Sequence, residues 1–286
     1  MRTSRTPGPD PGLFGPGSVT WRLHADPVLG VAGLRALMLQ ALHPRAAEAI
    51  SQNSAFREDV WGRLSRTTEF IGVTTYGTTA QALSAGAHVR AVHAAMATVD
   101  PISGHGYRVD EPELLAWVHC ALVDSVIDVL RRSGVALDDE QADRYVDEQV
   151  RSAALVGLEP TDVPHDGAAL AEAVREFRPQ LRATRVAREE VGYVVAPPIP
   201  TRLAPVARPA WSAVAGLAFA ALPSWARRMY SMPDLPGAAA LHGAATTVAL
   251  HALRASLRGV QTIVPPLRAG PHLRTARERL AARPDG

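Results

Sequence analysis

The chain has 286 residues, 47% of them hydrophobic and only 5% aromatic, which is enough to bury a core of alanine and aliphatic side chains in one large domain or two small ones. All thirty basic residues are arginine, they are spread along the chain, and the formal net charge is only +2, so the concentrated basic surface of a nucleic-acid-binding protein is excluded. Cys120 is the single cysteine, which excludes an internal disulfide and a cysteine-rich metal site; its apolar helical surroundings favour a buried, inert thiol over a nucleophile.

The two ends of the chain differ in composition from its middle. Residues 1–17 are rich in Arg, Pro and Gly and lack the apolar segment of a secretory signal, so they are predicted to form a disordered or extended arm. The apolar run from Ala213 to Leu222 is about half the length that a membrane span requires. We therefore expect a cytoplasmic protein without a membrane span, with one domain over 18–264 and a polar tail over 265–286.

Apolar residues recur at helical spacing along most of the chain, whereas the alternation typical of strands is nearly absent. His43 precedes a proline and marks a bend, 100–106 and 161–166 are predicted loops, and the proline-rich stretch 196–200 precedes a helical C-terminal section. The fold class is therefore all-α. The predicted helices cover residues 28–42, 45–52, 56–73, 77–98, 110–132, 138–155, 167–190, 202–221, 223–230 and 237–259.

The segment 61–93 holds the residues that suggest chemistry. Arg63, Arg66, Thr67 and Phe70 are spaced i, i+3, i+4, i+7 and share one face of a helix. Two guanidinium groups on an otherwise apolar face are costly to bury unless something satisfies them. The following alanine-rich helix can present His93 to the same interior, and a cationic wall that faces a single histidine is typical of a haem pocket between core helices.

Each of these arginines and hydroxyls also has an ordinary structural interpretation. Arg63 and Arg66 can pair with Asp59, Glu58 or Glu69 at the surface, or they can hold haem propionates, because arginine binds carboxylates with two parallel hydrogen bonds. We favour one arginine on a propionate and the other near the distal side of the haem. Thr67 can donate to a backbone carbonyl of its own helix or to bound oxygen.

The histidines are similarly ambiguous when they are considered alone. His93 without further information is more often a packed or surface histidine than a ligand. His88 precedes it by five residues, a rotation of about 140° on a helix, so the two cannot face the same iron. His119 lies on an apolar stripe, where a structural hydrogen bond and a role in the pocket are both possible. His43 is expected to be structural, at a helix C-terminus.

Six groups of short segments, spread in order over residues 13–232, carry a family resemblance. Together they resemble the rubber oxygenase (latex clearing protein) and MpaB-type oxygenase family, an all-α group of which several members bind haem b. The matching segments are Phe14 to Trp21, Arg35-Ala36-Leu37 with Leu39 to Pro44, Arg63 to Thr67, Val89-Arg90 to His93, Tyr107 to His119 (with Asp110, Pro112 and Leu114 to Val118), and Leu222-Pro223 with Arg227 and Tyr230.

The resemblance implies roles for particular residues. His93 matches the proximal haem-iron ligand of the rubber oxygenases, and Arg63 and Thr67 match their paired pocket arginine and threonine. Arg66 stands where those enzymes carry a lysine that can occupy the distal iron position, but a guanidinium stays protonated and cannot bind iron. We therefore expect Arg66 to be a fixed donor toward bound oxygen and Arg63 to hold a propionate. His119 is a further candidate for contact with the cofactor.

We therefore expect a haem b-dependent oxygenase or oxidase that uses dioxygen on a small or medium apolar organic substrate. The glutamate that acts as a base in rubber cleavage has no match here, since Glu48 and Glu69 are nearby but unaligned, so the substrate stays open. A non-catalytic haem sensor or carrier, with a filled distal position and no substrate cavity, and a cofactor-free helical scaffold are the alternatives. A di-iron bundle is disfavoured because Arg90 and Ala116, not glutamates, precede His93 and His119 by three residues. The sequence does not indicate an oligomeric state.

Overall fold

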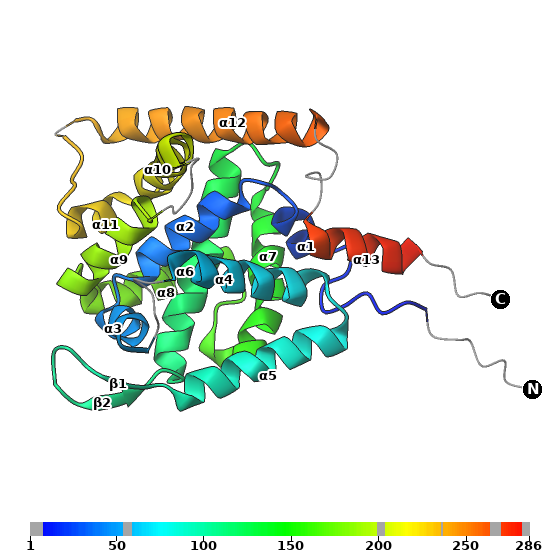
Figure 1. The fold of residues 1–286 in the computed structure, drawn as a ribbon, viewed down its shortest axis with the longest axis horizontal. Helices are drawn as coiled ribbons and strands as arrows, with labels where there is room; N and C mark the ends of the chain where they lie inside the picture. The colour runs from blue at the N-terminus through cyan, green and yellow to red at the C-terminus, as the bar shows by residue number, and fades with distance from the viewer. Residues whose placement is uncertain (1–7, 54–58, 199–203, 236, 264–269, 282–286) are drawn as a thin grey trace, which may run out of the picture.

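The computed structural model describes residues 8–53, 59–198, 204–235, 237–263 and 270–281, and the predicted all-α class is confirmed (Figure 1). Within these residues the chain forms a single domain of thirteen α-helices, two short 3₁₀ turns and a two-stranded antiparallel sheet. The helices are α1 (Val19–His24), α2 (Leu29–Gln40), α3 (Pro44–Asn53), α4 (Val60–Tyr76), α5 (Thr79–Ala95), α6 (Pro112–Arg132), α7 (Asp139–Val156), α8 (Gly167–Phe177), α9 (Arg185–Val195), α10 (Ala204–Ala220), α11 (Ser224–Met229), α12 (Ala239–Ile263) and α13 (Pro271–Ala281).

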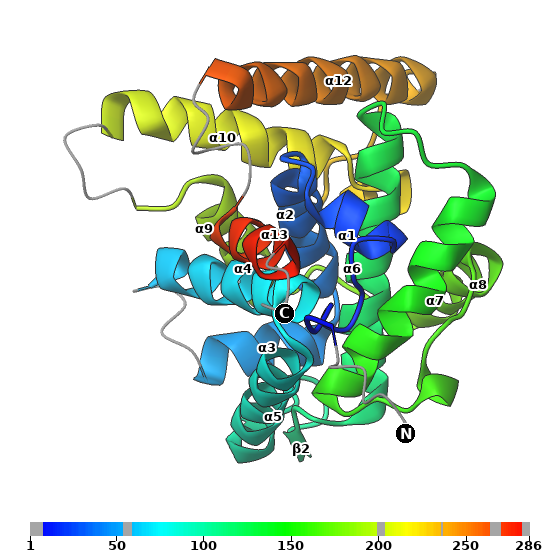
Figure 2. The ribbon, with the colours of Figure 1, turned by 90° about the vertical axis from the view of Figure 1, so that its right-hand side faces the viewer.

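The core is built around α2 and α6, which lie in the middle of the molecule in both views (Figures 1 and 2). Helices α10 and α12 cover one end of this pair, while α5 and the hairpin of β1 (Ala97–Val99) and β2 (Gly106–Arg108) lie at the other. Leucine and valine side chains fill the interface, together with the fully buried Trp117. Arg35 of α2 is only 3% exposed, and its guanidinium donates to Asp124 at 2.8 Å and Ser125 at 2.7 Å on α6, so the buried charge is paired.

Side-chain caps determine where α4 and α5 begin. The Asp59 carboxylate accepts from the backbone N–H of Gly62 at 2.8 Å at the start of α4. Thr78 and Gln81 form a reciprocal capping box at the start of α5, so the chain reverses between the two helices at Gly77. The helix predicted over 56–73 corresponds to α4, and its predicted start at Phe56 lies outside the described residues.

Four features differ from the sequence-based expectation. The loop predicted over 100–106 is largely the turn of the β1–β2 hairpin, and the helix predicted over 167–190 is divided into α8 and α9 around Pro179, which lacks a backbone N–H. The segment predicted as a polar tail contains α13, whose Leu273 is buried against the core. The described part of the predicted N-terminal arm is held in place, since Asp10 accepts from the N–H of Thr79 at 2.7 Å.

Candidate active site

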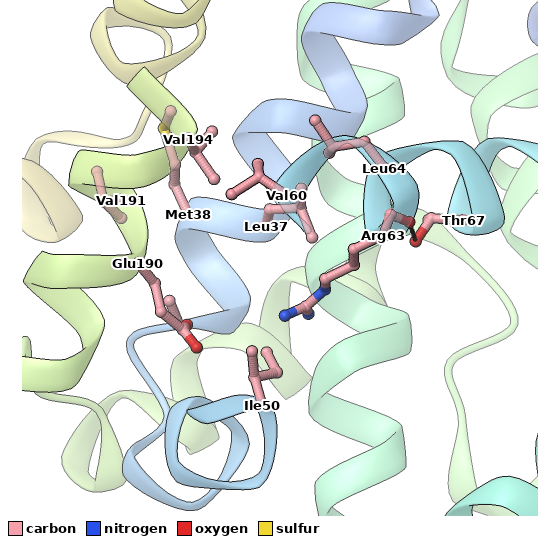
Figure 3. Close-up of a pocket in the computed structure, with 11 residues that line it drawn as sticks. Leu37, Met38, Ile50, Val60, Arg63, Leu64, Thr67, Glu190, Val191 and Val194 are labelled. Carbon is pink, nitrogen blue, oxygen red and sulfur yellow. Dashed lines mark hydrogen bonds between the residues drawn. The ribbon is translucent and has the colours of Figure 1, made fainter. Parts of the chain in front are cut away.

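Helices α2, α3, α4 and α9 surround a pocket that is partly open to solvent and encloses only about 20 Å³, room for about one water molecule (Figure 3). Eight of the side chains that line it are apolar and three are polar, which is the usual composition of a small-molecule site. The apolar ones come from all four helices: Leu37, Met38, Ala41, Ile50, Val60, Leu64, Val191 and Val194. The polar ones are Arg63, Thr67 and Glu190.

Arg63 is half-buried and points into the pocket. Its guanidinium extends from α4 toward the carboxylate of Glu190, which comes from α9, and the two groups approach each other beside Ile50 (Figure 3). Burial lowers the pKa of Arg63, the negative charge of Glu190 opposes that shift, and nearby Arg66 adds to it. An arginine pKa normally lies so far above neutrality that the group stays charged, and the pocket therefore contains a cation.

Arg66 does not share the pocket with Arg63, contrary to the expectation that both would line one buried face. Its side chain is 68% exposed and pairs with Asp59, the N-cap of α4, at 3.1 Å. Of the two alternatives that the sequence left open for these arginines, Arg66 therefore adopts the surface ion pair. Three helical positions turn the side chain by about 60° relative to Arg63, which is enough to move it from the pocket to the outer surface.

Thr67 lines the pocket at its exposed side, and its hydroxyl donates to the backbone carbonyl of Arg63 at 3.1 Å. This is the local helix hydrogen bond that was one of the two alternatives for this residue. The hydroxyl proton is therefore used within α4, and what the oxygen presents to the pocket is acceptor capacity.

His93 lies in the last turn of α5 and is half-buried. Its Nδ1 atom is enclosed and has no hydrogen-bond partner among the described residues. Burial lowers the pKa of His93, and the negative charge of Asp110 partly opposes that shift, so the imidazole is neutral at pH 7. His93 is not among the residues that line the pocket, whereas His88, five positions earlier, is exposed, in accordance with its predicted rotation.

His119 is 8% exposed on α6, and its Nε2 atom is enclosed without a hydrogen-bond partner in the described part of the chain. Burial lowers the pKa of His119 to about 4. It does not line the pocket. His43 is also buried, with an enclosed Nδ1 atom that no described group bonds and a pKa lowered by burial.

Glu190 is the pocket residue that the sequence analysis missed. It is 5% exposed on α9, whereas Glu189 beside it pairs with Arg185 at 2.7 Å on the outer face. The signal was present: Glu190 lies with Ala187 and Val194 on the face of α9 that helical spacing predicts to be buried. Glu48 and Glu69, the glutamates near the predicted site, do not line the pocket.

Comparison with known protein families gives a match that extends over residues 21–255 and so includes every residue of the pocket. The matching family is described as the ER-bound oxygenase mpaB/B'/Rubber oxygenase, catalytic domain. The chain belongs to this family. The protein is thus an oxidoreductase of an oxygenase family, as the dispersed sequence segments indicated. Comparisons with curated proteins and with solved structures found no match. None of the described helices combines the length and apolar character needed to cross a bilayer.

Among the described residues, His93 meets one requirement for holding a haem, which is a neutral imidazole for the iron. Iron binds the neutral imidazole, which is the form that burial favours at His93. A haem needs a single protein ligand on one side, so it does not require a cluster of ligating side chains, and the described residues contain no group of three or more His, Cys, Asp or Glu side chains arranged for a metal ion.

Proposed function

We propose that this protein is a haem b-dependent oxygenase, with His93 as the protein ligand of the iron. The observation that carries the proposal is the state of His93 in a chain of this oxygenase family: a neutral imidazole, half-buried, with an enclosed nitrogen that no described group bonds. When bound, haem supplies the dioxygen chemistry, and the protein supplies binding, orientation and exclusion of water.

The two arginines of α4 then have different tasks. Arg66 lies on the outer surface with Asp59 and is the candidate for holding a haem propionate, since propionates commonly remain near solvent and arginine binds them bidentately. Arg63 points into the apolar pocket, where a fixed cation stabilises developing negative charge. This assignment reverses the one that the sequence alone favoured, in which Arg63 held the propionate and Arg66 faced the distal side.

The family and the lining of the pocket favour catalysis over a sensor or carrier role. The family is one of oxygenases, and the pocket beside Arg63 and Thr67 has mostly apolar walls and is partly open to solvent. Such walls exclude water from a bound substrate and leave the polar groups to orient it. We therefore propose a small or medium, largely apolar organic substrate, with dioxygen as the oxidant.

An absorption spectrum of the purified protein tests this function directly, first as isolated and then after dithionite and carbon monoxide. The expected result is an intense Soret band that shifts on reduction and again with carbon monoxide, which shows that the position opposite His93 is accessible. If no Soret band appears after expression with sufficient haem, the result would refute haem binding and support the cofactor-free helical scaffold. A spectrum with two strong nitrogen ligands and no response to carbon monoxide would instead support the sensor or carrier.

A further inference from the structure

Helix α12 has a second apolar face, which points away from the molecule. The helix is the outermost layer at one end of the fold in both views, and no described element lies beyond it (Figures 1 and 2). Its inner face buries Leu250 and packs Leu253 against the core. On the opposite face, Leu241 is 73% exposed and Val248 is 68% exposed. A surface helix normally carries polar residues on its outer side, and a helix that is apolar on both sides is normally covered.

The outer face of α12 contains no carboxylate and no guanidinium group. The helix has no acidic residue, and its two arginines, Arg254 and Arg258, both bind the buried carboxylate of Asp26, at 2.9 Å and 3.0 Å. The other exposed positions from 241 to 256 are alanine, histidine or serine. A partner therefore cannot recognise this face by opposite charge. Adsorption to a lipid surface is also disfavoured, because it normally uses large apolar side chains with basic residues beside them.

The outer face repeats with the spacing of a helix pair. Its exposed residues follow one another in steps of four, three, four and three positions: Leu241, Ala245, Val248, Ala252 and Ala255. This is the heptad spacing at which one helix packs along another. Alanine at alternate positions of the repeat lets two helix axes approach closely, to about 8 Å. The pattern thus indicates that a second helix covers the face.

We propose that this face binds the same face of a second copy of the chain, as an antiparallel helix pair with a two-fold axis at Val248. Such an interface is its own complement, as in most dimers of identical chains. In this register Leu241 lies opposite the partner's Ala255, and Ala245 lies opposite the partner's Ala252. Each terminal leucine therefore meets a small residue. In a parallel pair the leucines would instead meet each other, and so would the alanines, which leaves crowded and empty layers in turn.

The length of the face sets the strength of the dimer. The stripe from Leu241 to Ala255 is about 21 Å long at about 1.5 Å per residue. One pair of helices of this length buries less than the roughly 800 Å² per partner that is usual in a stable interface. We therefore expect a reversible dimer with a Kd in the micromolar range.

Sedimentation velocity at several protein concentrations measures this equilibrium. The wild-type protein is expected to pass from monomer to dimer between about 1 and about 200 µM. Val248→Arg places two guanidinium groups together at the two-fold axis, so it should raise the Kd at least about tenfold. Leu83→Arg, at a position of α5 that is 54% exposed, is the matched control and should dimerise like the wild type. Both positions are exposed, and circular dichroism establishes that both variants are folded.

Two mixing experiments test the position of the axis and the direction of the helices. Val248→Glu alone should be monomeric, whereas an equal mixture of Val248→Glu and Val248→Arg should dimerise, because opposite charges then meet at the axis. Under mild oxidation Val248→Cys should form a disulfide-linked dimer, and the natural Cys120, at 1% exposure, does not compete. Leu241→Cys should not link to itself, because its two copies lie about 21 Å apart along the antiparallel pair. It should link to Ala255→Cys in a mixture of the two variants.

The proposal is overturned if the wild-type protein stays monomeric, if Val248→Arg dimerises as well as the wild type, or if the mixture of charged variants does not dimerise. Self-linking of Leu241→Cys as readily as Val248→Cys would exclude the antiparallel arrangement. A monomeric wild-type protein that sediments with phosphatidylcholine–phosphatidylglycerol vesicles, and loses this binding in Val248→Arg, would assign the face to a membrane instead. None of these readouts depends on haem or on turnover, so they stand apart from the proposed function.

Discussion

Helix α5, which carries His93, lies very close to α7 at Gly86, and Gly86→Ala should loosen that contact. Ala82 and Gly86 are the fully buried residues of α5. A Cβ atom at position 86 would lie 2.7 Å from the backbone carbonyl oxygen of Leu155 and 3.0 Å from its Cβ. The same carbonyl accepts a hydrogen bond from Arg90 at 2.6 Å, one turn further along α5, so the helices cannot separate locally without weakening that bond.

The expected magnitude follows from opposing contributions. Alanine is better than glycine in a helix interior by about 1 kcal/mol. Overpacking a close contact costs about 1–3 kcal/mol, and part of a hydrogen bond from a charged donor, about 1.5–3 kcal/mol when lost completely, is lost as well. The net result for Gly86→Ala is a decrease of about 1–3 kcal/mol in the free energy of unfolding. Gly216→Ala in α10 is the matched control, because its new Cβ would have no neighbour within 4 Å, and it should stabilise by up to about 1 kcal/mol.

Urea unfolding followed by circular dichroism measures both variants, and the Soret absorbance per protein measures haem content. Because a displaced α5 moves His93, Gly86→Ala should lower haem content even in buffer where the protein remains folded, whereas Gly216→Ala should not. Equal stability of the two variants would refute the reasoning about the α5–α7 contact. Normal haem content in a destabilised Gly86→Ala protein would show that the position of His93 does not depend on the α5–α7 contact.

Three further predictions concern the site and its histidines. His93→Ala should abolish the Soret band while His88→Ala retains it, and the opposite outcome would transfer the ligand role away from His93. Arg66→Ala should lower haem content more than oxygen consumption per haem, and Arg63→Ala should do the reverse; equal effects in both assays would mean that the two arginines do not have separate tasks. Burial lowers the pKa of His119 from its ordinary 6.5 to about 4, so between these pH values the unfolded chain binds a proton that the folded chain does not. The contribution of His119 to the free energy of unfolding should therefore be fully present above pH 6.5 and fall by up to about 3 kcal/mol toward pH 4. His119→Leu should reduce that slope in urea titrations at each pH, and an unchanged slope would exclude His119 as its source.

The helices that carry the candidate site were predictable because local chemistry specifies them. Apolar spacing, the Asp59 cap and the Thr78–Gln81 capping box define α4 and α5 without reference to the rest of the fold. The all-α class follows for the same reason. Helix α13 was not predicted, because its burial rests on few apolar residues, such as Leu273, in an otherwise polar segment.

The separation of the two arginines could not be predicted from the sequence. Arg63 and Arg66 lie about 60° apart on α4, within the width of an ordinary buried face. Which one points inward depends on where α3 and α9 pack, and α9 is distant in sequence. Glu190 was missed for a related reason: the predicted helix over 167–190 ended at this residue, so its apolar neighbours Val191 and Val194 were not recognised as the same helical face.

The inward direction of Arg63 depends on the elements that pack on both faces of α4. One of these elements lies outside the family match. Helix α13 begins after residue 255, where the match ends, yet it packs on the outer face of α4. His272 of α13 lies against Gly72 and its Nε2 atom is 2.8 Å from the carboxylate of Glu69. A helix that is contacted on one face by α13 and on the other by the walls of the pocket has little freedom to rotate about its axis. The C-terminal segment therefore helps to keep Arg63 directed at Glu190, although it contributes no residue to the pocket itself.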